Sequence, residues 1–545
     1  MLREIQCDEF KAYGKVRPAI KFHSGLNTVL GGANANNSIG KTTFLLIVDF
    51  VFGGDSYLNS DAITKVGSHT INFMFEFDAG YKYFSRNTTK SDVVNVCDES
   101  YNVLETISLE EFNETLQGLY NLDLYKSTFR NLIGRYFRIY GKDNYDENNP
   151  LHGHKKENFK SAILSIEKLF DVYQIIEEYK KSYDEVSDKL KALNSTRRFD
   201  LLPYGKITTK TQYKQNEKSI AQLQKDLENL SQNQTDEYFE LDREKAEKGG
   251  LIDGEISTLT RKRSRLVSQL NVIKANKEGN HTVNLDRFAE LSNFFPDTNL
   301  KKLSEIESFH IKIREILKEE YEEEAERLQM IIDSLNKKIE YLKVELNKQG
   351  IPAGIPRGYL QKYTEIQNNI DKYKSQNENY NLLNDLRASK KTAAEKLKQI
   401  EAKQLRTVES TINEQMVRFN DAIYETKRKA PVLKLGDGTR YEFYTPDDTG
   451  TGTSFKSLIL FDLSVLMHSK LPAIAHDSLL FKNVGDEPVE EIIKLYTTFE
   501  KQIFIAFDKD TAYSDETSKI LNDSKVIQLD EGGNELFGRS WNIKD

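Results

Sequence analysis

The chain has 545 residues, of which 30% are charged and 38% hydrophobic, and its formal net charge is -8. This composition excludes a protein built around one ordinary apolar core, whereas the slight acidity excludes no class of partner, because nucleic acid is bound by local basic strips. Two cysteines, a polar N-terminus and the lack of any apolar run near the roughly 20 residues of a membrane span favour a reduced, cytoplasmic setting without a membrane partner.

Residues 1–155 are predicted to form a mixed α/β lobe, because short β-branched and aromatic runs alternate with helical patterns. Helices are predicted to begin at Lys41 and near Ser127. The predicted strands are Ala19–His23, Leu26–Leu30, Thr70–Phe77 and Lys82–Thr88.

A turn rich in glycine and asparagine, residues 31–43, joins one of these strands to the helix at Lys41. It is typical of a P-loop, in which the helix N-terminus holds phosphate, the lysine reaches the β and γ phosphates, and the next hydroxyl binds Mg²⁺. The first glycine of the usual pattern is Ala35 here, so the entry to the loop must differ. A turn that holds no ligand is the alternative. We predict ATP contacts, with Thr42 also a metal ligand, from Asn34, Asn36, Asn37, Ser38, Ile39, Gly40, Lys41, Thr42 and Thr43.

Residues 156–430 are polar, with apolar residues spaced three and four apart. So narrow an apolar seam predicts a long antiparallel coiled coil, and a helical-bundle domain is the alternative. Segments 201–205 and 351–356 and the pair Gly249-Gly250 contain helix breakers and are predicted to interrupt the coil. The apolar cluster Phe294-Phe295-Pro296 places the expected reversal of the chain near residues 280–300.

Residues 431–545 are predicted to form a second α/β lobe. It is expected to open with a hairpin around Gly436-Asp437-Gly438 and to contain a helix over Ser454–His468. The predicted strands are Val432–Leu435, Arg440–Tyr444, Ala473–Asp477, Gln502–Asp508 and Lys525–Leu529.

The loop Asp448–Ser454 precedes the apolar helix of this lobe and consists of small and hydroxyl residues with one acid. Such a helix N-terminus favours an anion. In ABC ATPases a loop of this kind covers the γ-phosphate bound to the opposite subunit, and an ordinary capped helix is the alternative. The predicted contacts are Gly450, Thr451, Gly452 and Ser454.

Asp477 follows a buried strand candidate, which is the Walker B arrangement, and is predicted to bind Mg²⁺. A capped strand end is the alternative. Asp508 ends the next strand, where ABC ATPases carry their switch residue. The order of these features predicts an α/β ABC-type ATPase head split by a long antiparallel coiled coil.

The order of P-loop lobe, coil, and signature and Walker B lobe resembles the SMC proteins and the ATPase of the double-strand-break repair nuclease complex. It is more similar to a bacterial branch of SMC-like ATPases that carries Asn-Ser-Ile-Gly-Lys, Asp-Thr-Gly-Thr-Gly and His-Asp-Ser. This chain has those motifs at Asn37–Lys41, Asp448–Gly452 and His476–Ser478. The resemblance implies an ABC three-component defence or mobile-element setting, with a small middle subunit and a separate effector.

Several residues depart from the usual pattern. Ser478 stands where the catalytic glutamate is expected, and a serine is no base at neutral pH without activation, so hydrolysis is expected to be slow. Asp508 is the first substitute for that base and Asp510 the second. The resemblance implies a nucleotide contact from Lys11. No glutamine marks a Q-loop, and the segment expected to replace it holds Arg130, Arg135 and Arg138.

The P-loop and signature of one chain are not expected to meet, so the sequence predicts a homodimer with ATP between two heads. DNA is the partner that the resemblance implies. Basic groups at 261–265 and 427–429 offer modest support, and a solvated helix face is the alternative for each. The predicted function is a DNA-structure sensor that gates an effector. The alternatives are a nucleotide-dependent structural switch or scaffold with little hydrolysis, a DNA-repair or chromosome-maintenance ATPase, and a self-contained nuclease.

Overall fold

The computed structural model forms two compact units. The first comprises Met1–Asp184 and Thr392–Asp545, and the second comprises Glu185–Lys391. Within the described part of the chain, no helix combines the length and apolar character needed to cross a bilayer. The residues that the structure describes are 1–32, 39–199, 202, 204–232, 237–278, 300–348, 357–508 and 512–541.

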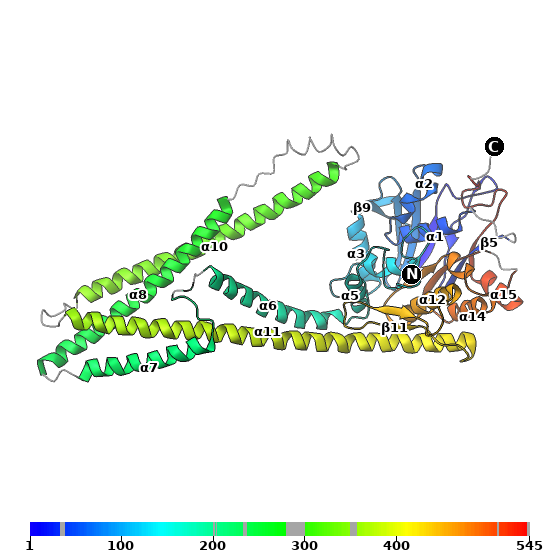
Figure 1. The fold of residues 1–545 in the computed structure, drawn as a ribbon. Coiled ribbons are helices and arrows are strands. Elements are labelled where there is room, and N and C mark those ends of the chain that lie inside the picture. Colours follow the sequence, from blue (N-terminus) through cyan, green and yellow to red (C-terminus); the bar gives the residue numbers. More distant parts are fainter. Residues whose placement is uncertain are drawn as a thin grey trace, which may run out of the picture. The chain divides into compact units, whose positions relative to one another are not determined.

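A five-stranded parallel sheet forms the centre of the first unit (Figure 1). Both ends of the chain contribute to it, because its second and third strands come from the C-terminal lobe and pair with strands of the N-terminal lobe. Its strands are largely buried and apolar, as a parallel sheet covered on both faces requires. In order, they are β10 (Phe137–Arg138), β13 (Ala473–His476), β14 (Gln502–Phe507), β5 (Leu26–Gly31) and β15 (Lys525–Leu529).

A six-stranded antiparallel sheet belongs to the same unit. Phe52, at the end of helix α1 (Lys41–Val51), packs edge-on against Phe75 of this sheet and against Phe137 and Phe504 of the parallel sheet. One aromatic core therefore joins the two sheets. The strands, in order, are β4 (Ile20–Lys21), β1 (Leu2–Gln6), β6 (Thr70–Phe77), β7 (Gly80–Asn87), β8 (Val93–Cys97) and β9 (Val103–Ser108).

Shorter elements complete the first unit, together with two long helices that continue into the second. The two hairpins are β2 (Lys11–Ala12) with β3 (Lys15–Val16), and β11 (Val432–Lys434) with β12 (Glu442–Tyr444). The remaining helices are η1 (Ser56–Asn59), α2 (Asp61–Val66), α3 (Leu109–Leu119), α4 (Phe129–Ile133), η2 (Gly134–Tyr136), α5 (Phe159–Leu169), α12 (Thr451–His468), α13 (Leu479–Lys482), α14 (Asp486–Tyr496) and α15 (Asp515–Asp523). The long ones are α6 (Tyr173–Arg198) and α11 (Arg357–Tyr424).

Every strand predicted in the two lobes is present, and the hairpin around Gly436-Asp437-Gly438 is confirmed as β11–β12. The helix predicted from Lys41 begins at that residue. The helix predicted near Ser127 is the short α4. The split α/β head is therefore confirmed, and its two lobes close into one sheet.

The second unit consists of long helices that pair in opposite directions. Among the described residues, α8 (Glu237–Glu278) runs antiparallel to α10 (Leu300–Lys348): Lys338 bonds Glu255, whereas Leu270 packs on Leu328. Helix α7 (Lys210–Gln232) pairs with α11 through Asn216 and Asn377. The antiparallel arrangement expected of the coil is confirmed.

Two details of the predicted coil differ in the structure. Gly249-Gly250 does not break the coil, because α8 runs through both residues; a helical glycine costs only about 1 kcal/mol, which the rest of a long helix outweighs. A break does separate α6 from α7, whereas the predicted break at 351–356 lies outside the described residues. The expected reversal near 280–300 lies almost entirely outside the described residues.

The first unit extends further along the helices than residues 155 and 431, the bounds that the sequence suggested for the lobes. The end of α11 explains this on the C-terminal side. Its apolar residues, three and four apart, are buried in the core of the first unit instead of in a solvated coil. These residues are Leu405, Val408, Ile412, Met416, Phe419 and Ile423.

Candidate nucleotide-binding site

The predicted site residues gather at the carboxyl edge of the parallel sheet. Strands β5, β13 and β14 run parallel, so the residues that follow Gly31, His476 and Phe507 emerge on the same side. Crevices at this edge are where open α/β sheets hold ligands. Lys41 and Thr42 therefore meet Asp477 and Asp508, although Thr42 and Asp477 are 435 residues apart in the sequence.

The start of α1 has the backbone that a P-loop needs. Gly40 has a φ of 100°, in the left-handed region, and a Cβ there would lie 2.6 Å from Leu536. Lys41 is only 6% exposed, and Thr42 directs its hydroxyl to the Walker B aspartate. The segment Ala33–Ser38 lies outside the described residues, so the predicted contacts of Asn34, Asn36, Asn37 and Ser38 stay predictions.

Asp477 is held at the end of β13 by three donors. The Thr42 hydroxyl and the Ser478 amide donate to Oδ1, at 3.1 and 2.7 Å, and the Tyr140 amide donates to Oδ2 at 3.1 Å. Burial raises the pKa of this carboxyl, the nearby Asp508 adds to the rise, and the three hydrogen bonds oppose it. A bound divalent cation would favour the ionised form, as a metal ligand requires.

Asp508 follows β14 and lies between two lysines. Its Oδ1 is 3.3 Å from the Nζ of Lys41, and its Oδ2 is 3.2 Å from the Nζ of Lys482. Gly31 makes this approach possible, because a Cβ at Gly31 would lie 2.2 Å from the carbonyl oxygen of Asp508. The predicted alternative, Asp510, lies outside the described residues.

A cavity of about 240 Å³ brings most of these groups together. Seven of the residues that line it were predicted from the sequence, and Tyr140, Leu479 and Lys482 were not. Lys482 is four residues after Ser478, and this helical spacing was the one available signal for it. The full lining is Ile39, Gly40, Lys41, Thr42, Thr43, Tyr140, Ser478, Leu479, Lys482 and Asp508.

The predicted signature loop lies at the start of α12. Asp448 organises it by accepting from the Gly450 amide at 3.0 Å and from the Thr453 hydroxyl at 2.8 Å. Gly452 packs against the backbone that directly follows α13, where a Cβ at Gly452 would lie 2.5 Å from the carbonyl oxygen of Asn483. Gly450, Thr451, Gly452 and Ser454 are not among the described residues that line the P-loop cavity of the same chain.

Lys11 lies on the short strand β2, and its Nζ is 3.2 Å from the Glu9 carboxylate. Its amide donates to the carbonyl of Leu536, whose own amide donates to the carbonyl of Ile39. Lys11 is therefore two hydrogen bonds from the P-loop backbone, but it is not among the described residues lining the cavity.

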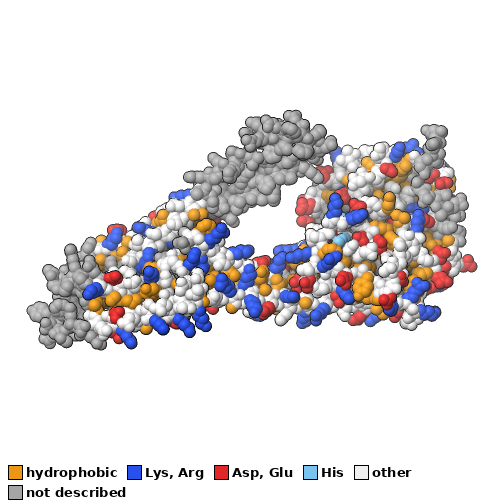
Figure 2. All heavy atoms as spheres, in the orientation of Figure 1, with side chains coloured by type: hydrophobic (Ala, Val, Ile, Leu, Met, Phe, Trp, Pro, Cys, Tyr) orange, Lys and Arg blue, Asp and Glu red, His pale blue; other side chains and the backbone are white. Residues whose placement is uncertain are grey.

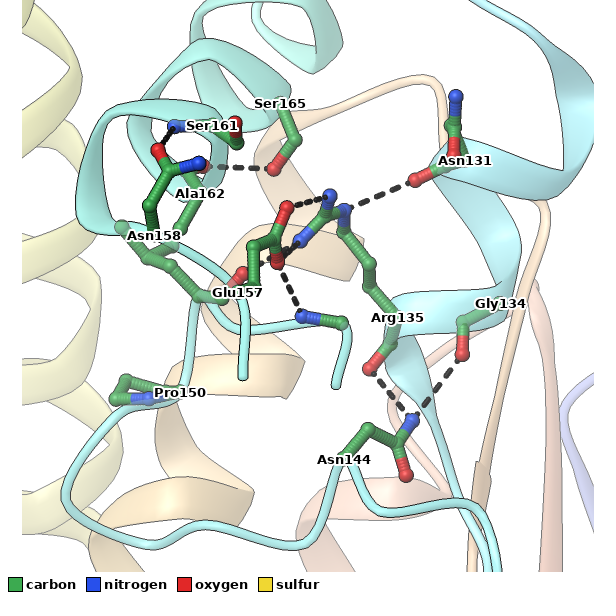
Figure 3. A network of polar contacts seen from close by, with 12 residues as sticks. Asn131, Gly134, Arg135, Asn144, Pro150, Glu157, Asn158, Ser161, Ala162 and Ser165 are labelled. Atoms are coloured by element: carbon green, nitrogen blue, oxygen red, sulfur yellow. Dashed lines mark hydrogen bonds and ion pairs between the residues drawn. The ribbon is translucent and has the colours of Figure 1, made fainter. Parts of the chain in front are cut away.

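The three arginines of the expected Q-loop segment are structural. Arg135 forms two hydrogen bonds to Glu157, at 2.5 and 2.6 Å, and another to the Leu151 carbonyl, a network shown in Figure 3. Arg130 bonds the buried Asp49, and Arg138 bonds Asp462 with both side chains fully buried. Among the described residues, Tyr140, which follows β10, is the member of this segment (128–141) that lines the cavity.

A network of buried hydrogen bonds holds the end of β13, the strand that precedes Asp477. Asp462 of α12 accepts two bonds from Arg138, each 2.9 Å long, and lies 3.1 Å from Nε2 of His476. The other ring nitrogen of His476 lies 2.6 Å from the Tyr496 hydroxyl. His476 is thus a satisfied core histidine that fixes the strand ending in Asp477.

The donors at the site fit Mg²⁺. A hydroxyl and a carboxylate, from Thr42 and Asp477, lie 3.1 Å apart beside the P-loop lysine. Mg²⁺ prefers oxygen ligands and is commonly held by one or two protein groups together with phosphate oxygens and water. Thr42 and Asp477 can supply these two protein ligands.

Two family models match parts of the chain. Residues 4–235 match the family model described as an AAA domain, and residues 419–541 match one described as an uncharacterised protein conserved in bacteria. No curated protein sequence matches the chain.

Solved structures of Smc heads are similar over nearly the whole chain at low identity. The Smc head domain with a coiled coil and joint from Pyrococcus yayanosii is 15% identical, with 99% of this chain and 96% of that chain covered and a TM-score of 0.47. A head with an extended coiled coil, bound to the C-terminal domain of ScpA, from Pyrococcus furiosus is 10% identical over 96% and 91%, with a TM-score of 0.32. An Smc head bound to the C-winged helix domain of ScpA is 7% identical over 95% and 92%, also with a TM-score of 0.32. The AAA-domain match over residues 4–235 and the order of the parallel sheet agree with a nucleotide-binding α/β head.

Proposed function

We propose that the chain binds Mg²⁺ and ATP at the P-loop cavity, that two heads close around the nucleotide, and that closure reports a DNA structure to a partner effector. The observation that carries the proposal is the contact between Thr42 and Asp477 beside the buried Lys41. It joins a metal-binding pair to a phosphate-binding cation at the edge of a parallel sheet.

The chain's own groups divide the work of binding. The first amides of α1 and the Lys41 ammonium neutralise phosphate charge, and Thr42 and Asp477 hold the metal. The metal, when bound, neutralises charge that develops on the phosphate oxygens. Lys41 lines the cavity and is only 6% exposed, so its ammonium group is shielded from solvent where an anion would bind.

Hydrolysis needs a group that orients or deprotonates water. Ser478 lines the cavity, but its hydroxyl titrates far above neutral pH. Asp508 lines the same cavity and carries the ionisable group, so we assign the role to Asp508. Both of its carboxylate oxygens contact a lysine Nζ, and these ammonium groups compete with a water molecule for the oxygens, so turnover should be slow.

The position of the signature loop supports a dimer. Its residues do not line the P-loop cavity of the same chain in the part that the structure describes. If the loop contacts a γ-phosphate, that phosphate must be bound to another chain. Contacts that exist only when two heads meet around ATP shift the equilibrium toward closure.

Support for DNA comes from the second unit. Arg261, Lys262 and Arg265 line a cavity of about 420 Å³ together with Tyr204, whose ring lies 4.9 Å from the Arg261 guanidinium. Figure 2 shows Lys and Arg side chains along the described helices of this unit, among apolar and acidic ones. Phosphate contacts need such charges, and binding should weaken steeply with salt.

The basic group at 427–429 gives weaker support. Lys427 pairs with Glu425, Lys429 pairs with Asp447, and Arg428 lies over the ring of Tyr424 at 4.7 Å. The interpretation as a solvated, locally paired face therefore suits this group better. The defence setting and the effector rest on the resemblance of the three motifs alone, and co-expression with the products of neighbouring genes tests them.

ATP turnover by the full chain, measured with and without DNA, tests the proposal. We expect slow turnover that DNA changes severalfold and that Lys41→Ala abolishes. Turnover that persists in Lys41→Ala would contradict the site. ATP binding without turnover in either condition would favour the second candidate, a structural switch, which the serine at position 478 supports.

A further inference from the structure

We propose that Lys482 is a second phosphate-binding cation of the site and that it makes the site prefer a nucleoside triphosphate over a diphosphate. The inference rests on the proposed function, because it requires nucleotide phosphates to bind at Lys41. It assigns a role to a residue that no sequence motif marked.

The geometry places two ammonium groups around one small anion. One oxygen of Asp508 lies 3.3 Å from the Lys41 Nζ, and the other lies 3.2 Å from the Lys482 Nζ. Lys41 is 6% exposed and Lys482 is 42% exposed, and both line the same cavity. Lys482 therefore occupies the open side of the cavity and Lys41 the closed side.

The two lysines can be bridged by one phosphoryl group as they are bridged by one carboxylate. A P-loop lysine holds the β and γ phosphates. Lys482 lies on the other side of the Asp508 carboxylate from Lys41, nearer the cavity mouth. Its ammonium group would therefore contact oxygens of the terminal phosphate. A diphosphate ends one phosphoryl group earlier, so Lys482 should contribute less to its binding.

Lys482 also balances a charge that would otherwise oppose ATP. Asp508 and a bound triphosphate are both anionic, and like charges within a few ångströms repel strongly in a partly buried site. Lys482 pairs with Asp508. The Asp508 carboxylate can therefore turn towards Lys482 and away from Lys41. Asp508 and the phosphate then compete for the lysines, and neutralising Asp508 should strengthen ATP binding.

The position of Lys482 connects the cavity to the signature loop. Lys482 is the last residue of α13, and the next residue, Asn483, presents its carbonyl to the closely packed Gly452. A cation that contacts the terminal phosphate of one site therefore adjoins the loop that would meet the other site of a dimer.

Competitive displacement of a fluorescent ATP analogue by ATP and by ADP, with Mg²⁺ and the full chain, tests the inference. In Lys482→Gln, we expect ATP binding to weaken by about tenfold and ADP binding by no more than about twofold, since a hydrogen bond to a charged group carries that order of effect. Lys482→Arg should restore most of the preference. Lys494→Gln is the matched control, because Lys494 also pairs with carboxylates in this lobe but does not line the cavity.

The outcomes separate this inference from the proposed function. If wild type binds ATP and Lys41→Ala does not, but Lys482→Gln weakens ATP and ADP equally or changes neither, the role of Lys482 is wrong and the nucleotide site stands. If wild type binds neither nucleotide, both fail. Asp508→Asn adds an independent arm: ATP binding should tighten by about tenfold, and weaker ATP binding would contradict the competition between carboxylate and phosphate.

Discussion

Asp508 and Ser478 line the same cavity but offer different chemistry to a water molecule. Asp508 contacts both lysines, whereas Ser478 directly precedes α13 as its N-cap and is 8% exposed. Asp508 could be suspected from the sequence, because it ends the strand that follows the Walker B strand, where ABC ATPases carry their switch residue. The pairing of Asp508 with Lys482 could not be predicted from the sequence, because that contact depends on the direction in which α13 extends after β13.

The base of the reaction can be identified by a pair of variants. Asp508→Asn should lower the turnover number by about 10²-fold or more, which is the usual contribution of a positioned base, while tightening ATP binding. Ser478→Ala should change turnover by less than about threefold. Single-turnover hydrolysis at saturating ATP measures both, and the reverse order of effects would move the role to Ser478.

The buried Arg138 should carry a structural role and no nucleotide contact. Arg138→Met leaves Asp462 buried without its guanidinium partner, at a cost of about 3–5 kcal/mol. Urea unfolding followed by the fluorescence of the head should show a lower midpoint, with Lys494→Gln as the surface control. A midpoint within the error of wild type would show that the Asp462 network does not hold the Walker B strand.

At the scale of elements, α12 and α13 meet through a glycine. A Cβ at Gly452 would lie 2.5 Å from the carbonyl oxygen of Asn483, which is backbone and cannot rotate away. A Cβ at Gly450 would meet the Asp448 carboxylate at 3.2 Å, and its φ of -64° suits any residue. A side chain at Gly452 would therefore clash with fixed backbone, whereas a side chain at Gly450 would meet only a movable carboxylate.

This difference predicts unequal effects of two similar substitutions. Gly452→Ala should displace α13 and reduce both ATP-dependent association and the preference for ATP over ADP, whereas Gly450→Ala should reduce the preference little. Sedimentation and nucleotide displacement on both variants measure this. An unchanged preference for ATP in Gly452→Ala would show that α12 and α13 are not coupled through this contact.

Helix α5 carries the buried Glu167, and α11 carries the half-buried Glu401, whose charge acts on it. Burial first, and then the charge of Glu401, raise the pKa of Glu167 to about 7. Since the folded state holds the proton more tightly, stability is full below the ordinary pKa of 4.5 and is lost as the pH rises towards 7. Glu167→Gln should therefore be more stable than wild type at pH 8, by about 3 kcal/mol at most, and the difference should vanish near pH 4.5. Urea midpoints across this range test it, and a difference that is constant with pH would contradict the shift.

The elements differ in how well their sequence predicts them. β6 and β15 match their predicted bounds because each is an uninterrupted strand pattern next to clear turns. β10 has only two residues and was missed, since its pairing with β13 comes from tertiary structure and not from local preference. The break predicted at Gly249-Gly250 is wrong for the opposite reason. The low helix propensity of two glycines is a local effect, and the rest of the long helix α8 outweighs it.

At the scale of the whole molecule, the split of the head was readable from the sequence because its motifs occur at both ends and the coil pattern lies between. The bounds of the units were less readable. The apolar residues near the end of α11 have the same spacing as a coil seam, but they are buried in the head core. Periodicity reports that a helix has an apolar face and not what covers that face.

ATP is proposed to bind at Lys41 and to bring two heads together. Sedimentation velocity with a fluorescent ATP analogue tests this most directly, because one experiment measures both the bound nucleotide and the mass of the species that carries it. With Mg²⁺, the nucleotide should sediment with a species of twice the chain mass, Asp508→Asn should increase its population, and Lys41→Ala should leave both the nucleotide and the chain in their slow-sedimenting forms. Nucleotide that sediments with a monomer only would contradict the dimer, and nucleotide that does not sediment with wild type at all would contradict the account.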